Sequence, residues 1–364
     1  MSYNVTIEKK PGSLVVITGE LPYEVLEAHR AAAVKHLAAD VEIAGFRKGH
    51  VPENILVSKI GEMPLITEMA EHALSEAYPQ IVAEHKLDVI GYPQIGITKI
   101  AKGNPLGFTI TVAVVPLMEL PDYFALAKKA NAEKESKEVT DEEVTNQIND
   151  ILRQKAAYER LQTKAQHNHE HDHSDPNHTH DDEPIEDIKD LPLPELTDEY
   201  VKGLGQFENV ADFKTKIREH LTIQKSQDVD SRHRAKITDA IIADTKVDLP
   251  QVMVDAEINQ MFAQMESDLE RAQLKLDDYL THIKKTKEDL KKEWVPGAEK
   301  RAKLQLVLNE IAKREKIEAD PSLVDAQTDA LRAQYKDADE KRVRVYVTSV
   351  LTNEAVLKKL EETT

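Results

Sequence analysis

The chain has 364 residues, a formal net charge of −18 and no cysteine. A chain of this length is expected to form two or three domains, and the lack of cysteine excludes disulfide bonds and thiol catalysis. The strong negative charge opposes general binding to nucleic acids, and no apolar run approaches the ~18 residues that a membrane-spanning helix needs.

Residues 1–120 are predicted to form an α+β domain with a small antiparallel sheet and helices on one side of it. Apolar residues alternate between residues 106 and 114, as in a strand with one buried face. Alternation at 3–7 and an apolar run at 14–17 indicate two further strands joined by a turn. Helices are predicted at residues 22–41, 53–60 and 63–86.

The segment between the first two predicted helices reads Gly45-Phe46-Arg47-Lys48-Gly49-His50-Val51-Pro52. Glycine permits tight backbone turns, and proline suits the beginning of a following helix. Arginine and large aromatic residues often anchor interfaces, and arginine can form two hydrogen bonds to one phosphate. The composition therefore favours an exposed loop tip that presents Phe46, Arg47 and Lys48 to a partner. The alternative is an ordinary turn in which Phe46 packs onto its own domain.

The middle of the chain is predicted to contain a connector, an arm helix and a linker. Residues 121–138 begin with a proline and then contain many charged residues, as expected for a connector. The arm helix is expected over residues 139–165, beginning with a capping box formed by Thr140 and Glu143. A polar segment at 166–190 then interrupts the helical pattern.

Residues 166–190 are rich in histidine and acidic residues and contain no Phe, Trp or Tyr. Such a segment cannot bury enough apolar surface to offset the entropy lost on ordering, so we expect a disordered linker. Imidazoles among carboxylates suit Zn²⁺ or Ni²⁺. This leaves a solvated tether, adventitious metal binding and dedicated metal buffering as alternatives. The candidate ligands are His167, His169, His171, His173, His178 and His180.

Residues 191–364 carry narrow apolar stripes at helical spacing, which are typical of helical arms or hairpins. The pair Asp320-Pro321 has the residue types that begin a helix. The β-branched segment 343–357 is compatible with a strand, but its apolar spacing favours a helix. An all-helical C-terminal part is therefore predicted.

A group of flexible apolar residues in this C-terminal part has two interpretations. Methionine side chains repack easily, so the group could form an adaptable surface for unfolded polypeptides. Packing between helices is the alternative, and it is favoured for Met261 and Met265. The candidate client-binding residues are Met253, Met261, Phe262 and Met265.

The sequence contains no recognisable active site. The histidines outside the linker segment that lie in or near the N-terminal helices lack partners at catalytic spacing, and we interpret them as surface or packing residues. They are His29, His36, His72 and His85. No glycine-rich phosphate loop, nucleophile elbow or Cys/His zinc pattern is present. We therefore expect no catalytic residue and no cofactor.

Several motifs resemble those of the trigger factors. Residues 45–52 are similar to the ribosome-docking signature of that family, and they lie between two helices of an N-terminal α+β domain. The segments 193–201 and 248–250 resemble later parts of the family pattern in the same order. The likeness covers about residues 1–165 and 191–364. It implies a ribosome-binding domain followed by an elongated all-α C-terminal domain with helical arms.

The resemblance implies an ATP-independent, cytoplasmic chaperone. It would contact a protein of the large ribosomal subunit and nearby ribosomal RNA at the exit tunnel, and it would shield nascent polypeptides. It implies no membrane or DNA partner and leaves a weak homodimer open. The residues carried over are the docking triplet Phe46, Arg47 and Lys48 and the loop-shaping residues Gly45, Gly49 and Pro52.

The chain departs from the family pattern at one place. Typical members carry a proline-isomerase domain of the FK506-binding type between the arm helix and the segment near residue 191. Here that position holds only residues 166–190, which have no aromatic residue to line a prolyl pocket. We therefore expect a member without isomerase activity. Peptidyl-prolyl isomerisation and metal buffering are the alternative functions.

Overall fold

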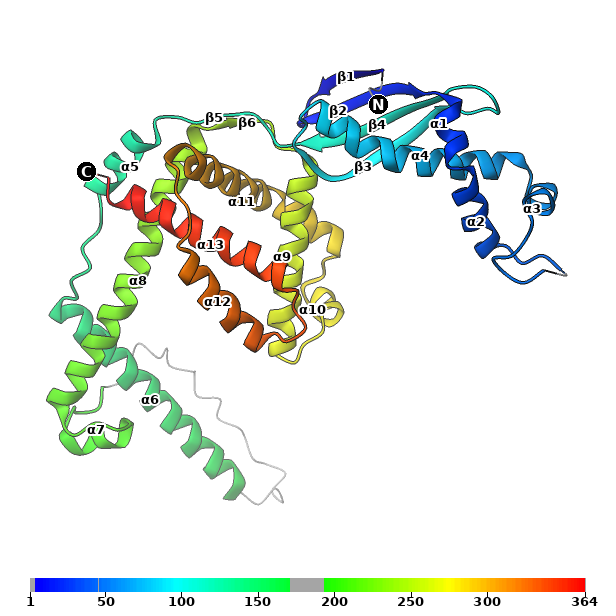
Figure 1. Ribbon diagram of the computed structural model, residues 1–364. Helices are drawn as coiled ribbons and strands as arrows, with labels where there is room; N and C mark the ends of the chain where they lie inside the picture. The colour runs from blue at the N-terminus through cyan, green and yellow to red at the C-terminus, as the bar shows by residue number, and fades with distance from the viewer. Residues whose placement is uncertain (1–3, 45, 171–192, 364) are drawn as a thin grey trace. The chain divides into compact units, whose positions relative to one another are not determined.

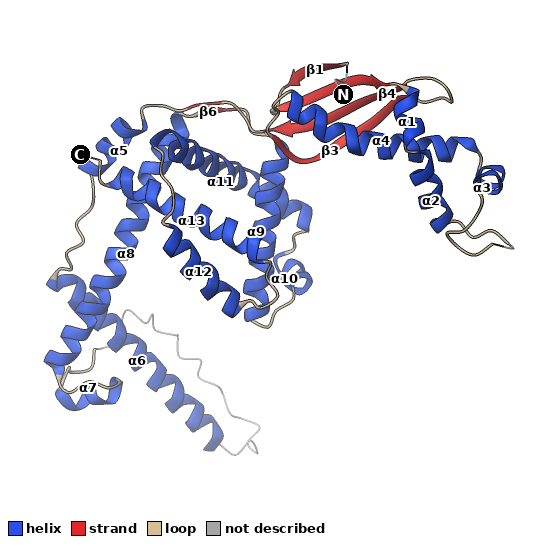
Figure 2. Ribbon diagram, in the orientation of Figure 1, coloured by secondary structure: helices blue, strands red, loops and turns tan. Residues whose placement is uncertain are grey.

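The computed structural model describes residues 4–44, 46–170 and 193–363. The chain forms two compact units, one made of Met1–Tyr123 with Ile241–Val356 and the other of Phe124–Ala240 with Leu357–Thr364. Figures 1 and 2 show the helices and strands of each unit. None of the described helices combines the length and the apolarity that a bilayer crossing needs.

The first unit contains a four-stranded antiparallel sheet with strand order β1-β2-β4-β3. The strands are β1 (Val5–Lys10), β2 (Leu14–Leu21), β3 (Val89–Lys99) and β4 (Leu106–Val114). On β4 the alternate residues Leu106, Phe108 and Ile110 are fully buried. The alternating pattern therefore predicted both the position of this strand and its buried face.

Four helices complete the N-terminal part of this unit. They are α1 (Tyr23–Ala28), α2 (Arg30–Asp40), α3 (Glu53–Ile60) and α4 (Glu62–Glu84). Helix α4 lies across one face of the sheet (Figure 1), where Leu65, Ile66 and Met69 share a core with Phe108 and Ile110. The predicted arrangement of a small antiparallel sheet with helices is confirmed.

The single helix predicted at residues 22–41 is divided in two. The N–H of His29 donates to the carbonyl oxygen of Leu26 at 2.9 Å, which is an i→i−3 bond, and the backbone of His29 has φ −91° and ψ −1°. This tighter turn ends α1, and α2 then begins in a new direction. Because neither glycine nor proline stands at the break, the sequence pattern did not indicate it.

The second part of the same unit is helical, apart from a short ladder between β5 (Met118–Glu119) and β6 (Lys246–Val247). Helices α9 and α11 pack through Val254, Ile258 and Ala298. Its helices are α9 (Gln251–Arg271), α10 (Leu276–Ile283), α11 (Lys287–Glu315), α12 (Pro321–Gln334) and α13 (Glu340–Glu361), the last of which continues into the second unit.

Two C-terminal predictions are confirmed by these helices. Asp320 accepts a hydrogen bond from the N–H of Ser322 at 2.9 Å, and Pro321 occupies the first turn of α12. The β-branched segment 343–357 lies within α13, so its interpretation as a helix is also confirmed. Between residues 193 and 363 the only strand is the two-residue β6, and the other regular elements are helices joined by loops.

The described part of the second unit is built from helices. They are α5 (Tyr123–Ala132), α6 (Asp141–Glu170), α7 (Asp198–Leu204) and α8 (Val210–Asp244). The first residue of α5 and the last four residues of α8 belong to the first unit. Helix α6 begins with the predicted capping box, in which the N–H of Thr140 donates to the Glu143 carboxylate at 2.8 Å and the N–H of Glu143 donates to the Thr140 hydroxyl at 3.2 Å. A hydrophobic cluster joins α6, α7 and α8 through Val144, Ile148, Leu152, Val201 and Phe213.

The structure adds regular elements to the two segments that were expected to be irregular. Helix α5 lies inside the predicted connector at 121–138. Helix α6 continues to Glu170, so residues 166–170 of the predicted linker have a helical backbone. Residues 171–190 of that linker lie outside the described residues.

Candidate functional site

The loop between α2 and α3 is held to its own domain by backbone hydrogen bonds. The N–H of Gly49 donates to the carbonyl oxygen of Ala38 in α2 at 2.8 Å, and the N–H of His50 donates to the carbonyl oxygen of Arg47 at 2.9 Å. The second bond closes a four-residue turn in which Gly49 is the third residue, with φ +81°. A positive φ at the third residue is typical of a type II turn and favours glycine.

A small hydrophobic cluster supports the base of this loop. Ala38, Val51 and Leu56 are buried together, and partly buried apolar side chains of α2, the loop and α3 pack around them. Pro52 occupies the N-cap position of α3 with φ −59°, which suits its ring. Glu53 at the start of α3 accepts a hydrogen bond from Arg30 of α2 at 2.8 Å. The two helices that flank the loop are therefore linked by both apolar and ionic contacts.

The three side chains of the predicted triplet lie on the outside of the domain. Phe46 is 42% exposed, and Arg47 and Lys48 are also exposed. Among the described residues, neither cation forms an ion pair or a side-chain hydrogen bond. Phe46 is thus not buried in its own domain, which disfavours the ordinary-turn interpretation. Gly45, which was expected to shape the loop, lies outside the described residues.

A second candidate surface is a cleft formed by α9, α10 and α11. Its lining combines apolar and polar side chains: Met261, Gln264, Met265, Asp268, Leu269, Tyr279, Trp294 and Arg301. The ring of Phe262 packs at 4.6 Å, between centroids, against that of Trp294. The structure therefore brings Met261 and Met265 into one cleft with Phe262 beside it, whereas Met253 is half-buried in the first turn of α9 and does not line it.

Packing between helices and exposure to a client were the two interpretations of these methionines, and the cleft shows features of both. Met261 and Phe262 pack partly against the buried Val254 and Ile258, as a core residue would. Met261 also lines the cleft with Met265. Such a surface can accept an apolar side chain of variable shape, because methionine has many low-energy rotamers.

Further exposed apolar side chains on α12, at its C-cap and on α13 were missed by the sequence analysis. They are Leu323, Tyr335, Val345, Tyr346 and Val350. On α13 the buried stripe contains Val347, which is only 2% exposed, whereas Val345 and Tyr346 lie on another face. The sequence did carry a signal for them. Residues 343–350 contain more apolar side chains than one buried stripe of a helix can hold.

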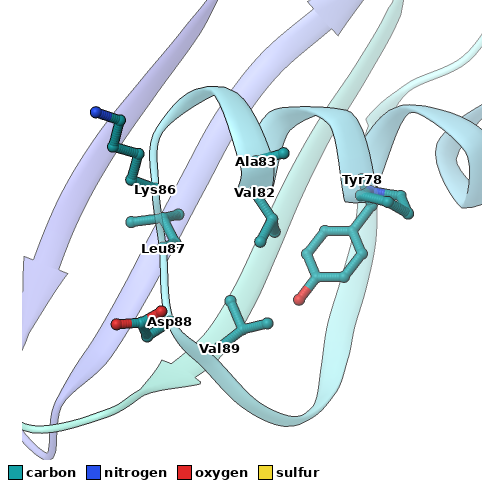
Figure 3. Close-up of a pocket in the computed structure, with 8 residues that line it drawn as sticks. Tyr78, Val82, Ala83, Lys86, Leu87, Asp88 and Val89 are labelled. Atoms are coloured by element: carbon teal, nitrogen blue, oxygen red, sulfur yellow. The ribbon is translucent and has the colours of Figure 1, made fainter.

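A hollow at the end of α4 is lined mainly by apolar groups (Figure 3). Its lining residues are Tyr78, Pro79, Val82, Ala83, Lys86, Leu87, Asp88 and Val89. Burial raises the pKa of the Tyr78 phenol above its usual 10.0, so this hydroxyl stays protonated at neutral pH. The lining contains no histidine and one carboxylate, that of Asp88.

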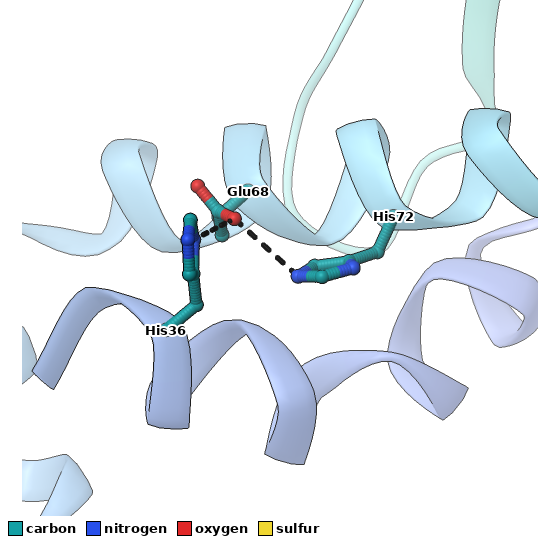
Figure 4. A group of neighbouring side chains, drawn as sticks. All are labelled: His36, Glu68 and His72. Atoms are coloured by element: carbon teal, nitrogen blue, oxygen red, sulfur yellow. Dashed lines mark hydrogen bonds and ion pairs between the residues drawn. The ribbon is translucent and has the colours of Figure 1, made fainter. Parts of the chain in front are cut away.

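The predicted histidine ligands of the linker cannot be placed, because the side chains of His167 and His169 and the residues His171, His173, His178 and His180 lie outside the described residues. A different histidine group is brought together in the N-terminal part. His36 of α2 lies beside Glu68 and His72 of α4 (Figure 4). His36 and His72 are partly exposed residues at a contact between two helices, and the packing of α2 against α4 brings them together, which the sequence analysis did not predict.

Comparisons with known proteins match both ends of the chain to one family. The family model for the bacterial trigger factor protein matches residues 3–151, and the model for its C-terminus matches residues 209–362. The trigger factor of Moorella thermoacetica is 27% identical over 97% of this chain and 92% of its own length. That alignment spans 414 positions, more than the 364 residues of this chain, so the relative contains residues without a counterpart here.

Other relatives and a solved structure agree with this match. The trigger factor of Bacillus subtilis is 26% identical over 91% of this chain and 92% of its own length. A solved structure described as promiscuous substrate recognition in folding and assembly activities of the trigger factor chaperone has a TM-score of 0.52 and 16% identity. It is matched over 99% of this chain and 100% of that one, which supports the fold. Because two models of the same family match most of its residues, this chain belongs to the trigger factor family.

Proposed function

We propose that this protein is an ATP-independent cytoplasmic chaperone that docks on the ribosome near the exit tunnel and shields nascent chains. The observation that carries the proposal is the exposed triplet Phe46-Arg47-Lys48 on a loop whose backbone is tied to α2. The sequence has no glycine-rich phosphate loop, which agrees with a binding mechanism that does not consume ATP.

Docking would combine one apolar anchor with two positive charges. Phe46 can fill an apolar site on a ribosomal protein, and Arg47 and Lys48 can approach acidic side chains or RNA phosphates. A micromolar dissociation constant corresponds to about −8 kcal/mol, which a few such anchors can supply. Reversible docking of this strength suits a chaperone that must release each nascent chain, and its ionic part should weaken with added salt.

The client-binding surface would consist of separate apolar sites rather than one pocket. The cleft around Met261 and Met265 and the exposed apolar residues of α12 and α13 provide such sites. Apolar patches with polar rims are typical of surfaces that bind other polypeptides. Several weak sites can hold unfolded chains of many sequences, because no single side chain must be recognised.

We also propose that the protein lacks prolyl isomerase activity. No aromatic residue is present between residues 166 and 190, where family members carry that domain. A proline-limited peptide assay should therefore give no rate above the uncatalysed one. Metal binding by the histidines of this segment stays a prediction, because their side chains lie outside the described residues.

Sedimentation with 70S ribosomes tests the docking proposal. The variant F46A/R47A/K48A should lose most of its co-sedimentation at low salt, whereas wild type should pellet with ribosomes. A matched control is Y92A/K9A/K35A, which removes one exposed aromatic and two exposed cations elsewhere in the same part of the chain. Equal pelleting of the triplet variant and wild type would overturn the proposal, and equal loss in the control would show that the position of the triplet does not matter.

A further inference from the structure

Helices α2 and α4 carry a compact group of two imidazoles and one carboxylate that the proposed function does not use (Figure 4). The Nδ1 atom of His36 lies 2.6 Å from Oε1 of Glu68, and the Nε2 atom of His72 lies 3.4 Å from the same oxygen. One potential ligand atom from each of the three residues lies within 4.8 Å of the other two. Glu68 and His72 are four residues apart, so they share one face of α4.

The three side chains differ in solvent exposure, so the group has one open side and one buried side, as a binding site needs. The side chain of His36 is 59% exposed, whereas that of Glu68 is only 15% exposed. The Nε2 atom of His72 is buried and has no hydrogen-bond partner among the described residues. A buried imidazole nitrogen without a hydrogen bond costs free energy, and a metal ion beside Glu68 would satisfy it.

Two further imidazole rings lie beside the ring of His72. The ring of His29 is stacked on that of His72, with 6.4 Å between centroids and 12° between planes. His29 also lies 3.6 Å from a carboxylate oxygen of Glu76, at the next turn of α4. His36 contacts the same His72 ring edge-on at 6.0 Å. His29 and His36 thus lie beside the ring that would carry one of the metal-binding nitrogens.

We propose that Nδ1 of His36, Nε2 of His72 and Oε1 of Glu68 bind one divalent transition-metal ion of the Zn²⁺ type. Two imidazoles and one carboxylate form a donor set that Zn²⁺ accepts, with a fourth position left to water on the exposed His36 side. In a tetrahedral site with bonds of about 2.0–2.2 Å, ligand atoms lie about 3.3–3.5 Å apart. The separations of 2.6 and 3.4 Å lie close to this range and all three atoms lie within 4.8 Å of one another, so side-chain rotation can bring them to that geometry.

A metal ion on Nδ1 of His36 takes the place of the hydrogen bond to Glu68, and the neutral ring then carries its proton on Nε2. The ion then links α2 to α4 directly. His36 stands two residues before Ala38, whose carbonyl oxygen accepts the hydrogen bond from Gly49. The site thus reinforces the helix to which the candidate docking loop is attached.

Zn²⁺ titration of the full chain tests the proposal. Because the linker histidines would also bind the ion, the experiment uses a full-length background in which all six are replaced by serine. Isothermal titration of this background with zinc chloride should show one ion per chain. The variants H36Q, E68Q and H72Q should each weaken binding at least about tenfold. H85Q, a histidine at the end of α4 outside the group, should leave it unchanged.

The outcomes separate a site from general surface binding. Absence of Zn²⁺ binding in the background would overturn the proposal, as would unchanged affinity in H36Q and E68Q or an equal loss in H85Q. If H72Q fails to fold by circular dichroism, H36Q decides the result, because its side chain is exposed and its removal should not affect folding. Addition of Zn²⁺ should also raise the unfolding temperature of the background and not that of H36Q.

Discussion

The backbone N–H of Gly49 donates a hydrogen bond to the carbonyl oxygen of Ala38 at 2.8 Å. Ala38 is only 2% exposed and belongs to the cluster beneath the loop, so this bond connects an exposed turn to a buried part of α2. The three residues before Gly49 are exposed, yet the backbone that carries them is held at the end of the turn. A held backbone reduces the conformational entropy lost on binding a partner.

Replacement of Gly49 by alanine should destabilise the loop. Gly49 has φ +81°, and a Cβ atom placed there meets no other atom within 4 Å, so the cost comes from the backbone alone. That cost is about 1–2 kcal/mol for a non-glycine residue. Urea unfolding followed by circular dichroism measures it, and ribosome affinity should fall in the same variant.

Gly297→Ala is the matched control for this prediction. Gly297 lies inside α11 without a positive φ, and a Cβ atom there is also free of contacts. Alanine should therefore stabilise that helix by about 0.5–1 kcal/mol. Stabilisation by both substitutions would contradict the assigned backbone geometry of Gly49.

The only tryptophan of the chain, Trp294, lines the cleft of α9, α10 and α11 and so reports on it directly. Binding of an unfolded polypeptide without tryptophan should shift the emission of Trp294 toward shorter wavelength, because the client excludes water from the cleft. Met265→Gln should weaken this binding severalfold, since a polar side chain in the cleft disfavours apolar clients. Fluorescence titration measures both effects.

The control for the cleft is Met253→Gln, because Met253 belongs to α9 but does not line the cleft. This variant should bind the client as wild type does. An unchanged emission spectrum at saturating client, with binding detected by another method, would place the client elsewhere, for example on α12 and α13.

Tyr123 should make the stability of the folded protein depend on pH in the alkaline range. Burial and a hydrogen bond from its hydroxyl to Glu315 at 2.7 Å raise the pKa of the phenol to about 12. Because the folded-state pKa exceeds the usual 10.0, this contribution to stability is complete below pH 10 and is lost as the pH rises toward 12. Tyr123→Phe should lose about 0.5–1.5 kcal/mol at pH 7 and fall less steeply above pH 10.

Urea titrations at several pH values test this prediction. Tyr335→Phe serves as the control, because Tyr335 is 57% exposed, and its replacement should leave the pH dependence of wild type unchanged. Parallel curves for wild type and Tyr123→Phe between pH 9 and 11.5 would show that Tyr123 does not couple to stability in this range.

Local features of the fold could be predicted from the sequence because their causes lie within a few residues. The alternation of β4 and the reciprocal hydrogen bonds of Thr140 and Glu143 appear where their patterns placed them. The exposed character of the triplet at 46–48 likewise follows from its composition between two glycines. Such elements need no information about distant parts of the chain.

Features that depend on contacts between distant segments could not be predicted. The break at His29 occurs where α1 and α2 each pack against α4, and no local signal marks it. The pairing of β5 with β6 joins residues far apart in the chain. His36 and His72 meet only because α2 lies beside α4, so their spacing in the sequence carries no sign of the group.

Site-specific photo-crosslinking tests the central claim most directly. A photoreactive phenylalanine analogue at position 46 should crosslink purified ribosomes through a component of the large subunit, and added salt should reduce the yield. The same analogue at position 92, where Tyr92 is 97% exposed, should give little product. Equal yields at the two positions, or no ribosomal product from position 46, would contradict docking through the loop.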